Sequence, residues 1–289
     1  MSTAVRAGRR TVKVRRPDKA LFDEGGETKA DLAEYYARIA PLMLAQIRDR
    51  PVALQRFPDG IDSGGFFVKH PSTPSWVSRV ETEHGSMMRC QDAATLVWCA
   101  DQAAIEIHMW LSKEPNLGMP DRMILDLDPP EATAAGFEAC KATAWDVREE
   151  LDSLGLAAYV MTTGSKGLHV HSPLRPELTD QEVRDLAGMI ADRVAARRPE
   201  ERTTKFRKAA RRGRLFVDYL RNGRDQLAVA PYSVRARPGA PVAAPITWEE
   251  LDGLESPRVF SLDLRREECP FAGMGRHARS PRKARAKLD

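Results

Sequence analysis

The chain has 289 residues, of which 42% are hydrophobic and 30% charged, and its formal net charge is +4. A chain of this length can bury a large core in one catalytic domain, but so small a net charge does not by itself identify a partner. No apolar run reaches membrane-spanning length and no signal peptide is recognisable, so we expect a cytoplasmic protein with no membrane partner. The four cysteines include no Cys-x-x-Cys pair, so neither a zinc site nor a disulfide framework is indicated.

Basic residues are unevenly distributed along the chain. Residues 202–214 carry seven basic groups and no acidic one, the first nineteen residues carry seven, and residues 276–287 add six more. Such clusters suit a phosphate backbone, and we assign phosphate contact to 202–214. The simplest parse is a flexible basic N-terminus over 1–12, one catalytic domain over 13–271 and a flexible basic tail over 272–289.

Helical and strand patterns together predict an α+β fold. Thr28 with Asp31 predicts the start of a helix, because the apolar residues that follow recur at helical spacing. Lys29 is then the first helical residue, and free N–H groups would converge near it. The next expected elements, in chain order, are strands within 51–70, a helix over 92–104, a strand over 105–111, a strand over 122–128 and a helix over about 135–154.

The second half continues with strands and one strong capping signal. Strands are expected over 157–162 and 168–174, and Thr179 with Glu182 forms a capping box that opens another helix. A strand follows around Asp218. The proline-rich stretch 237–245 is typical of a surface connection, and a short helix follows it.

Two aspartates lie one residue apart in the apolar run 122–128. Side chains in a strand alternate between faces, so Asp126 and Asp128 would share a face with Ile124. Two carboxylates on one apolar strand face repel each other and lose hydration, which favours a cation between them. Mg²⁺ or Mn²⁺, with oxygen ligands, is the simplest choice. The alternative is an ordinary strand that ends in a solvated turn.

A short glycine-containing loop follows the strand over 157–162. Its residues 163–167 offer two glycines, two hydroxyls and Lys166, which suit an anion, and His169 follows on the next strand. No helix follows the loop, so it is not a Walker A motif. With Asp218 as a third strand carboxylate, the set is typical of a two-metal phosphoryl or nucleotidyl transferase.

These motifs resemble those of the archaeo-eukaryotic primase superfamily, and more closely the polymerase domain of bacterial ligase D and its stand-alone relatives. The resemblance covers about 13–264 and implies a primase-polymerase core with mixed or antiparallel sheets flanked by helices. The matching segments are Asp126-Leu-Asp128-Pro, Thr163-Gly-Ser-Lys166-Gly167-Leu-His169, Phe216-Val-Asp218-Tyr, Pro58-Asp-Gly60, Gly65-Phe66-Phe67-Val-Lys69, Leu96-Val-Trp98, Glu106-Ile-His108-Met-Trp110 and Ala230-Pro-Tyr-Ser233-Val-Arg235.

The resemblance assigns roles to individual residues. Asp126, Asp128 and Asp218 would be catalytic and would hold two Mg²⁺ or Mn²⁺ ions, one activating a primer 3′-hydroxyl and the other neutralising the triphosphate. Arg221 departs from the polar neutral residue that relatives often carry, so the contact expected there is in doubt. The residues assigned to the incoming NTP or dNTP are His108, Thr163, Ser165, Lys166, Gly167, His169, Arg211 and Arg235.

The resemblance also assigns DNA contacts. Phe66 and Phe67 are adjacent, so at most one faces the core comfortably and the other can stack on a template base. Arg56 and Lys69 bracket them as candidates for template phosphates. Lys19 and Lys29 match lysines that bind the 5′-phosphate on the downstream side of a gap.

The function implied is a template-dependent repair polymerase or primase, associated with the nucleoid, that fills short gaps at DNA breaks with nucleotides, favouring ribonucleotides. A metal-dependent nuclease or phosphoesterase, and a non-catalytic end-bridging module, are the alternatives. The sequence shows no ligase lysine motif, so we expect ligation to come from a separate DNA ligase, together with an end-binding protein. The repair pathway, the preferred metal, the nucleotide preference and the oligomeric state stay open.

Overall fold

The computed structural model describes residues 1–22 and 26–288. The chain, for which one catalytic domain over 13–271 was predicted, divides into two compact units. Unit 1 comprises Met1–Trp110, Leu227–Ala244 and Phe260–Glu268, and unit 2 comprises Leu111–Gln226, Pro245–Val259 and Cys269–Asp289. Each contains a six-stranded sheet with helices, which confirms the predicted α+β class. Among the helices within the described ranges, none is long and apolar enough to cross a membrane.

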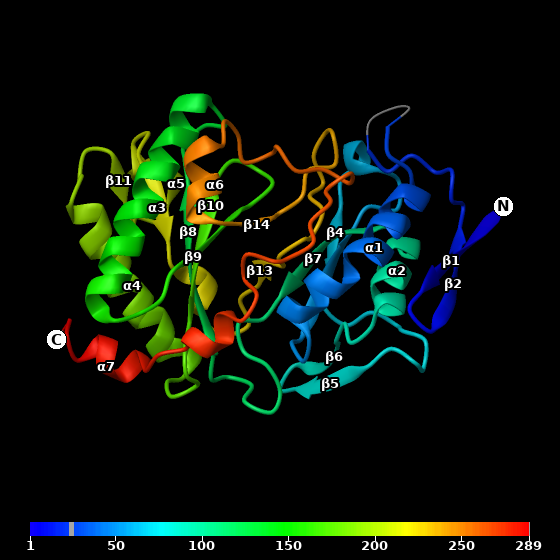
Figure 1. Ribbon diagram of the computed structural model, residues 1–289, viewed down its shortest axis with the longest axis horizontal. Coiled ribbons are helices and arrows are strands. Elements are labelled where there is room, and N and C mark those ends of the chain that lie inside the picture. Colours follow the sequence, from blue (N-terminus) through cyan, green and yellow to red (C-terminus); the bar gives the residue numbers. More distant parts are fainter. Residues whose placement is uncertain (23–25, 289) are drawn as a thin grey trace. The chain divides into compact units, whose positions relative to one another are not determined.

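Unit 1 is built on an antiparallel sheet in the order β13-β7-β3-β6-β5, with β4 paired to β3. The capping box of Thr28 and Asp31 opens α1 as predicted, and α1 packs against α2 (Figure 1). The elements are β1 (Ser2–Ala7), β2 (Arg10–Arg15), α1 (Lys29–Ile47), β3 (Val52–Arg56), η1 (Ile61–Ser63), β4 (Phe66–Val68), β5 (Arg79–Thr82), β6 (Gly85–Met88), α2 (Ala93–Asp101), β7 (Ala104–Met109) and β13 (Ala228–Val229).

The N-terminus of the chain is an antiparallel hairpin rather than a flexible segment over 1–12. β2 alternates buried and exposed residues, with Val12 and Val14 buried among α1 and α2. Its exposed positions carry the basic side chains. The period-two alternation of apolar and basic residues over 10–15 is therefore a strand signal that the net charge of the segment obscured.

Unit 2 contains a sheet in the order β11-β12-β8-β10-β9-β14, in which only the β11–β12 pair is parallel. α3 and α4 pack against each other and against the sheet (Figure 1). The elements are β8 (Arg122–Asp128), α3 (Ala134–Leu154), β9 (Tyr159–Thr162), β10 (Leu168–Pro173), α4 (Asp180–Ala196), β11 (Arg202–Thr203), α5 (Lys208–Arg211), β12 (Leu215–Asp218), η2 (Leu220–Asn222), β14 (Pro245–Ile246), α6 (Trp248–Gly253), η3 (Met274–His277) and α7 (Pro281–Arg285).

Two further segments differ from the prediction: 237–245, expected to be a surface connection, and 272–289, expected to be a flexible tail. Within 237–245, residues 241–245 are buried, and Pro245 begins a strand that pairs with β9. The tail over 272–289 includes η3 and α7, and Arg282 donates two hydrogen bonds to the Glu177 carbonyl. The apolar residues of both segments are scattered among prolines and arginines and are buried by distant elements. Their spacing therefore shows neither a helical nor a strand periodicity that could have predicted this burial.

Candidate active site

The three predicted catalytic aspartates lie on neighbouring strands of unit 2. In the β8–β12 register Asp126 is the Cα partner of Asp218, and Asp128 is the partner of Phe216. Leu125 and Leu127, which alternate with the β8 aspartates, are buried, so the predicted separation of apolar and acidic faces is confirmed. The sheet therefore brings together carboxylates that are 90 residues apart in sequence.

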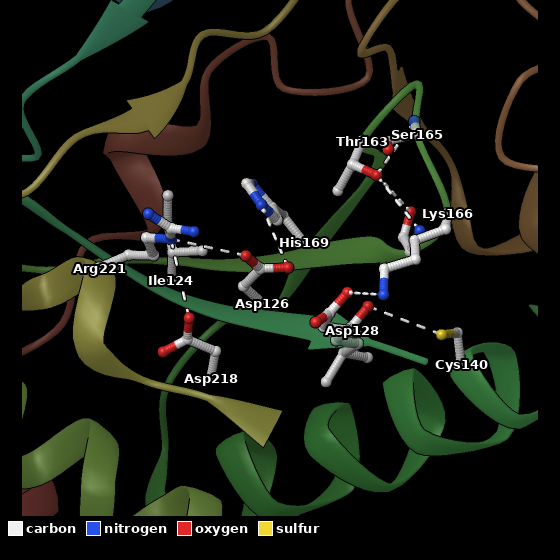
Figure 2. A network of polar contacts seen from close by, with 12 residues as sticks. Ile124, Asp126, Asp128, Cys140, Thr163, Ser165, Lys166, His169, Asp218 and Arg221 are labelled. Atoms are coloured by element: carbon white, nitrogen blue, oxygen red, sulfur yellow. Dashed lines mark hydrogen bonds and ion pairs between the residues drawn. The ribbon is translucent and has the colours of Figure 1, made fainter. Parts of the chain in front are cut away.

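Each of these carboxylates faces a basic side chain of the same unit (Figure 2). Asp128 accepts from Lys166 Nζ at 2.9 Å and from Arg211 Nη1 at 3.0 Å. Asp126 lies 3.5 Å from His169 Nε2. The negative charge of Asp128 is thus compensated by two side chains that the sequence assigned to nucleotide binding.

Arg221, whose role was left open, reaches both of the paired aspartates. Its Nε lies 3.6 Å from Asp126 Oδ2 and 3.8 Å from Asp218 Oδ2 (Figure 2). The side chain is 44% exposed, so the guanidinium can move into solvent at little cost. A neutral side chain at 221 could not form these two ion pairs.

The carboxylates are suited to a hard divalent cation. Burial raises the pKa of Asp218, and the negative charge of Asp126 raises it further. A cation between the strands would relieve both effects, and carboxylate oxygens are the ligands that Mg²⁺ and Mn²⁺ prefer. Within residues 1–22 and 26–288, however, the ligand atoms of the three aspartates do not all lie within 4.8 Å of one another. The carboxylate oxygens of the three aspartates are nevertheless the kind of ligand that fits Mg²⁺ or Mn²⁺.

The loop 163–167 is pinned tightly against β8. The Thr163 hydroxyl donates to the Gly167 carbonyl at 2.9 Å and accepts from the N–H groups of Ser165 and Gly167, both at 3.3 Å. A Cβ on Gly167 would lie 1.9 Å from the Leu127 carbonyl oxygen, so only glycine permits this approach. The structure thus places the Thr163 hydroxyl inside the loop, while Lys166 extends to Asp128 and to the Pro129 carbonyl.

Arg258 is a residue of this loop region that no sequence motif indicated. Its Nε donates to the Ser165 carbonyl at 2.6 Å. A cavity of about 170 Å³ adjoins the loop, and Arg258, Ser165, Lys166 and Thr133 are among its lining residues. Two cations beside one loop strengthen its suitability for a phosphate chain.

His108 and Arg235, the nucleotide-binding candidates of unit 1, are brought together by Glu106. Its carboxylate lies 3.0 Å from His108 Nε2 and 3.1 Å from Arg235 Nε, and it accepts the N–H of Ala236. Burial would raise the pKa of Glu106, but the hydrogen bond with His108 and the charge of Arg235 outweigh burial and lower it to about 2. Glu106 belongs to the segment Glu106-Ile-His108 that resembles the family motifs, but the resemblance assigned it no role.

Phe66 and Phe67 of unit 1 are each 51% exposed, so neither of these two serves as a core residue. The Phe66 ring lies 5.8 Å from the Arg56 guanidinium, and the Phe67 ring packs edge-on to His108 at 5.1 Å. Arg56 also donates to the Gln102 carbonyl, and Lys69, which follows β4, is exposed. Two aromatic faces, rather than one, are available to a base.

The start of α1 does not offer the free N–H groups that the sequence suggested. The Lys29 N–H donates to the Lys19 carbonyl, the Ala30 N–H to the Pro17 carbonyl, and the Asp31 N–H to the Thr28 hydroxyl. The Lys29 side chain is buried, and its Nζ donates to the Arg15 carbonyl at 2.9 Å and lies 3.4 Å from Asp101. Lys19 pairs instead with the exposed Asp59 at 2.9 Å.

Comparison with known proteins decides the family. Residues 28–269 match the family described as LigD, primase-polymerase domain. The chain belongs to this family. The chain is 38% identical over 260 residues to the multifunctional non-homologous end joining DNA repair protein LigD of Mycobacterium tuberculosis, and 37% identical over 265 residues to the LigD of Pseudomonas aeruginosa. These alignments cover 85% and 90% of this chain but 34% and 31% of the relatives, so the chain spans about a third of their length.

A solved structure also supports the membership of this chain in the LigD primase-polymerase family. The polymerase domain from Mycobacterium tuberculosis ligase D in complex with DNA superimposes with a TM-score of 0.83 at 33% identity. The match covers 93% of this chain and 99% of that domain. The fold inferred from the motifs is therefore that of the LigD primase-polymerase family.

Proposed function

We propose that this chain is a template-dependent nucleotidyltransferase that extends a primer strand at DNA breaks. The observation that carries the proposal is the trio Asp126, Asp128 and Asp218 on adjacent strands, flanked by the phosphate-type loop 163–167 in a chain of the LigD primase-polymerase family. The printed names of the relatives, non-homologous end joining proteins, support a role in the repair of broken ends.

The three aspartates would hold Mg²⁺ or Mn²⁺. Divalent ions bound there would lower the pKa of the primer 3′-hydroxyl and neutralise charge on the leaving pyrophosphate. Lys166 and Arg211, which face Asp128, could turn toward phosphate oxygens of the nucleotide. Hydrogen bonds between these cations and a phosphate are stronger than hydrogen bonds between neutral groups. Arg258 would add a second cation to the triphosphate end of the site.

The remaining assignments to the nucleotide are divided between the units. His169 is buried beside Asp126, and Ser165 and Gly167 shape the loop. In unit 1, the Glu106 carboxylate fixes the orientations of His108 and Arg235, which we assign to the incoming nucleotide. We include ribonucleotides among the substrates.

DNA would be held by unit 1 through stacking and charge. Phe66 and Phe67 expose rings to template bases, with Arg56 and Lys69 beside them. We assign recognition of a downstream 5′-phosphate to Lys19, whose exposed partner Asp59 is easily displaced, and a supporting role to the buried Lys29. Lys19→Ala should remove the preference for a gap with a 5′-phosphate over a 5′-hydroxyl, unless the wild type shows none. Ligation would come from a separate ligase, and an end-binding protein would deliver the DNA.

A primer-extension assay tests the function. Wild type, Asp128→Ala and Asp192→Ala are compared on gapped, recessed and unprimed templates with NTP or dNTP; Asp192 is an exposed aspartate of α4 and serves as the matched control. We expect extension by the wild type and the control, none by Asp128→Ala, and similar DNA affinity for all three. Metal-dependent degradation of labelled DNA without extension would favour a nuclease, and binding with neither activity would favour an end-bridging module.

A further inference from the structure

A hollow of about 380 Å³ opens beside Asp218 and has no part in the loop that we assign to the triphosphate. It lies wholly in unit 2, between α4, η2 and the segment that precedes α5. Its lining includes Gln181, Arg184, Phe206, Asp218, Arg221 and Arg224.

The chemistry of this hollow suits a single nucleic-acid strand. Three guanidinium groups and one catalytic carboxylate line it, and Phe206 is 67% exposed, although a phenyl ring is normally buried. Arg184 makes no hydrogen bond or ion pair to any residue within 1–22 and 26–288. Arginines that can bind phosphates, beside an aromatic face, are the usual elements of a single-strand groove.

The segment that carries Phe206 is fixed to the catalytic centre. Arg211 Nη2 donates to the Phe206 carbonyl at 3.0 Å, while Nη1 of the same guanidinium donates to Asp128 at 3.0 Å. The aromatic ring therefore projects from a backbone held beside the carboxylates, and its exposure is not that of a loose loop.

The order of the β-strands in the sheet indicates which nucleic-acid strand the hollow can bind. β12, with Asp218, lies on one side of β8, whereas β10, β9 and the loop between them lie on the other. Figure 2 shows the same order, with Asp218 and Arg221 at one end and Ser165 and Lys166 at the other. In phosphoryl transfer the attacking and leaving oxygens are roughly in line, so the attacking hydroxyl enters opposite the pyrophosphate. The hollow is on the side of the attacking group.

We propose that this hollow binds the 3′ end of the primer strand. Phe206 stacks on a terminal base, Arg184 and Arg224 bind the phosphates that precede it, and the terminal hydroxyl is directed toward Asp218. The inference rests on the proposed polymerase function. It assigns a nucleic-acid subsite to residues outside the three motifs that identified the family.

The test follows the primer end directly, without turnover. A primer-template with 2-aminopurine at the primer 3′ terminus is titrated with wild type, Phe206→Ala, Phe206→Trp and the double variant Arg184→Ala with Arg224→Ala. The control is Arg175→Ala. Arg175 is exposed and follows the C-terminal end of β10, away from the loop 163–167 that precedes this strand. Folding is checked by melting temperature, and nucleotide affinity is measured separately.

We expect Phe206→Ala to lose the change in fluorescence and to weaken primer-end affinity roughly tenfold, and Phe206→Trp to restore both. The double arginine variant should lower the slope of log K against log salt by about 0.9 for each duplex phosphate that is no longer bound. Arg175→Ala should bind the primer end like the wild type. Nucleotide affinity should stay constant throughout.

Two results would overturn the subsite. One is an unchanged signal and affinity in Phe206→Ala and in the double variant; the other is a loss of nucleotide affinity in place of primer affinity. A wild type that binds the primer end through Phe206 yet never extends it would refute the polymerase proposal and leave the subsite standing. The two hypotheses are thus separated.

Discussion

Replacing Gly167 by alanine should disturb the phosphate-type loop and the catalytic strand together. The added Cβ would lie 1.9 Å from the Leu127 carbonyl oxygen and 3.1 Å from its carbon, whereas real Cβ atoms essentially never approach closer than 3.0 Å. The loop must therefore move by at least about 1 Å, or β8 must bend between its two aspartates. Overpacking of this kind costs about 1–3 kcal/mol, which corresponds to a fall in Tm of roughly 2–12 °C for a chain of this size.

The matched control is Gly253→Ala at the end of α6, where a Cβ would meet no atom within 4 Å. Scanning calorimetry and nucleotide binding are measured for both variants and the wild type. We expect Gly253→Ala to match or slightly exceed the wild-type Tm, because alanine favours the helix. Equal Tm values and equal nucleotide affinities for the two variants would refute the close approach of the loop to β8.

Three further predictions concern the charged side chains Lys166, Arg221 and Glu106. Lys166→Ala should weaken nucleotide binding about 10- to 100-fold while leaving DNA affinity within about twofold, measured by separate titrations; equal losses would mean that the loop is only structural. Arg221→Gln should tighten Mn²⁺ binding several-fold in calorimetric titration without nucleotide, because the guanidinium competes for two aspartates; an unchanged Kd would contradict this. The pKa of Glu106 is lowered from 4.5 to about 2, so its stabilising effect is complete above about pH 4.5 and is lost as the pH falls through about 2. Glu106→Gln should flatten the dependence of Tm on pH in that window, and a Tm curve parallel to the wild type would argue against the buried pair.

The elements with a strong local pattern could be predicted from the sequence. The capping boxes at Thr28 and Thr179 open α1 and α4 where expected, and the alternation of β8 separates Asp126 and Asp128 from buried leucines. These signals are local, since a cap spans three residues and a strand face repeats every second residue. The family motifs then assigned the third carboxylate, Asp218, to the same site.

Features that depend on distant partners could not be read in this way. The partner of Lys29 is Asp101, 72 residues away, so no local pattern indicated that this lysine at a helix start is buried. Arg258 reaches the loop from a segment without a motif, and Phe206 looks like any phenylalanine in a basic run until its exposure is known. Local periodicity carries no information about which distant surface a side chain meets.

The pairing of Lys166 with Asp128 would make the binding of the two proposed ligands, a triphosphate and a divalent ion, interdependent. A triphosphate that draws the ammonium away leaves the carboxylate without one of its cations, and so increases its attraction for a divalent ion. Thermodynamic linkage requires the reverse as well: an ion on Asp128 releases the lysine and raises the affinity for the triphosphate by the same factor. At the proposed site, one ion pair between the loop and β8 would thus make nucleotide and metal binding positively cooperative.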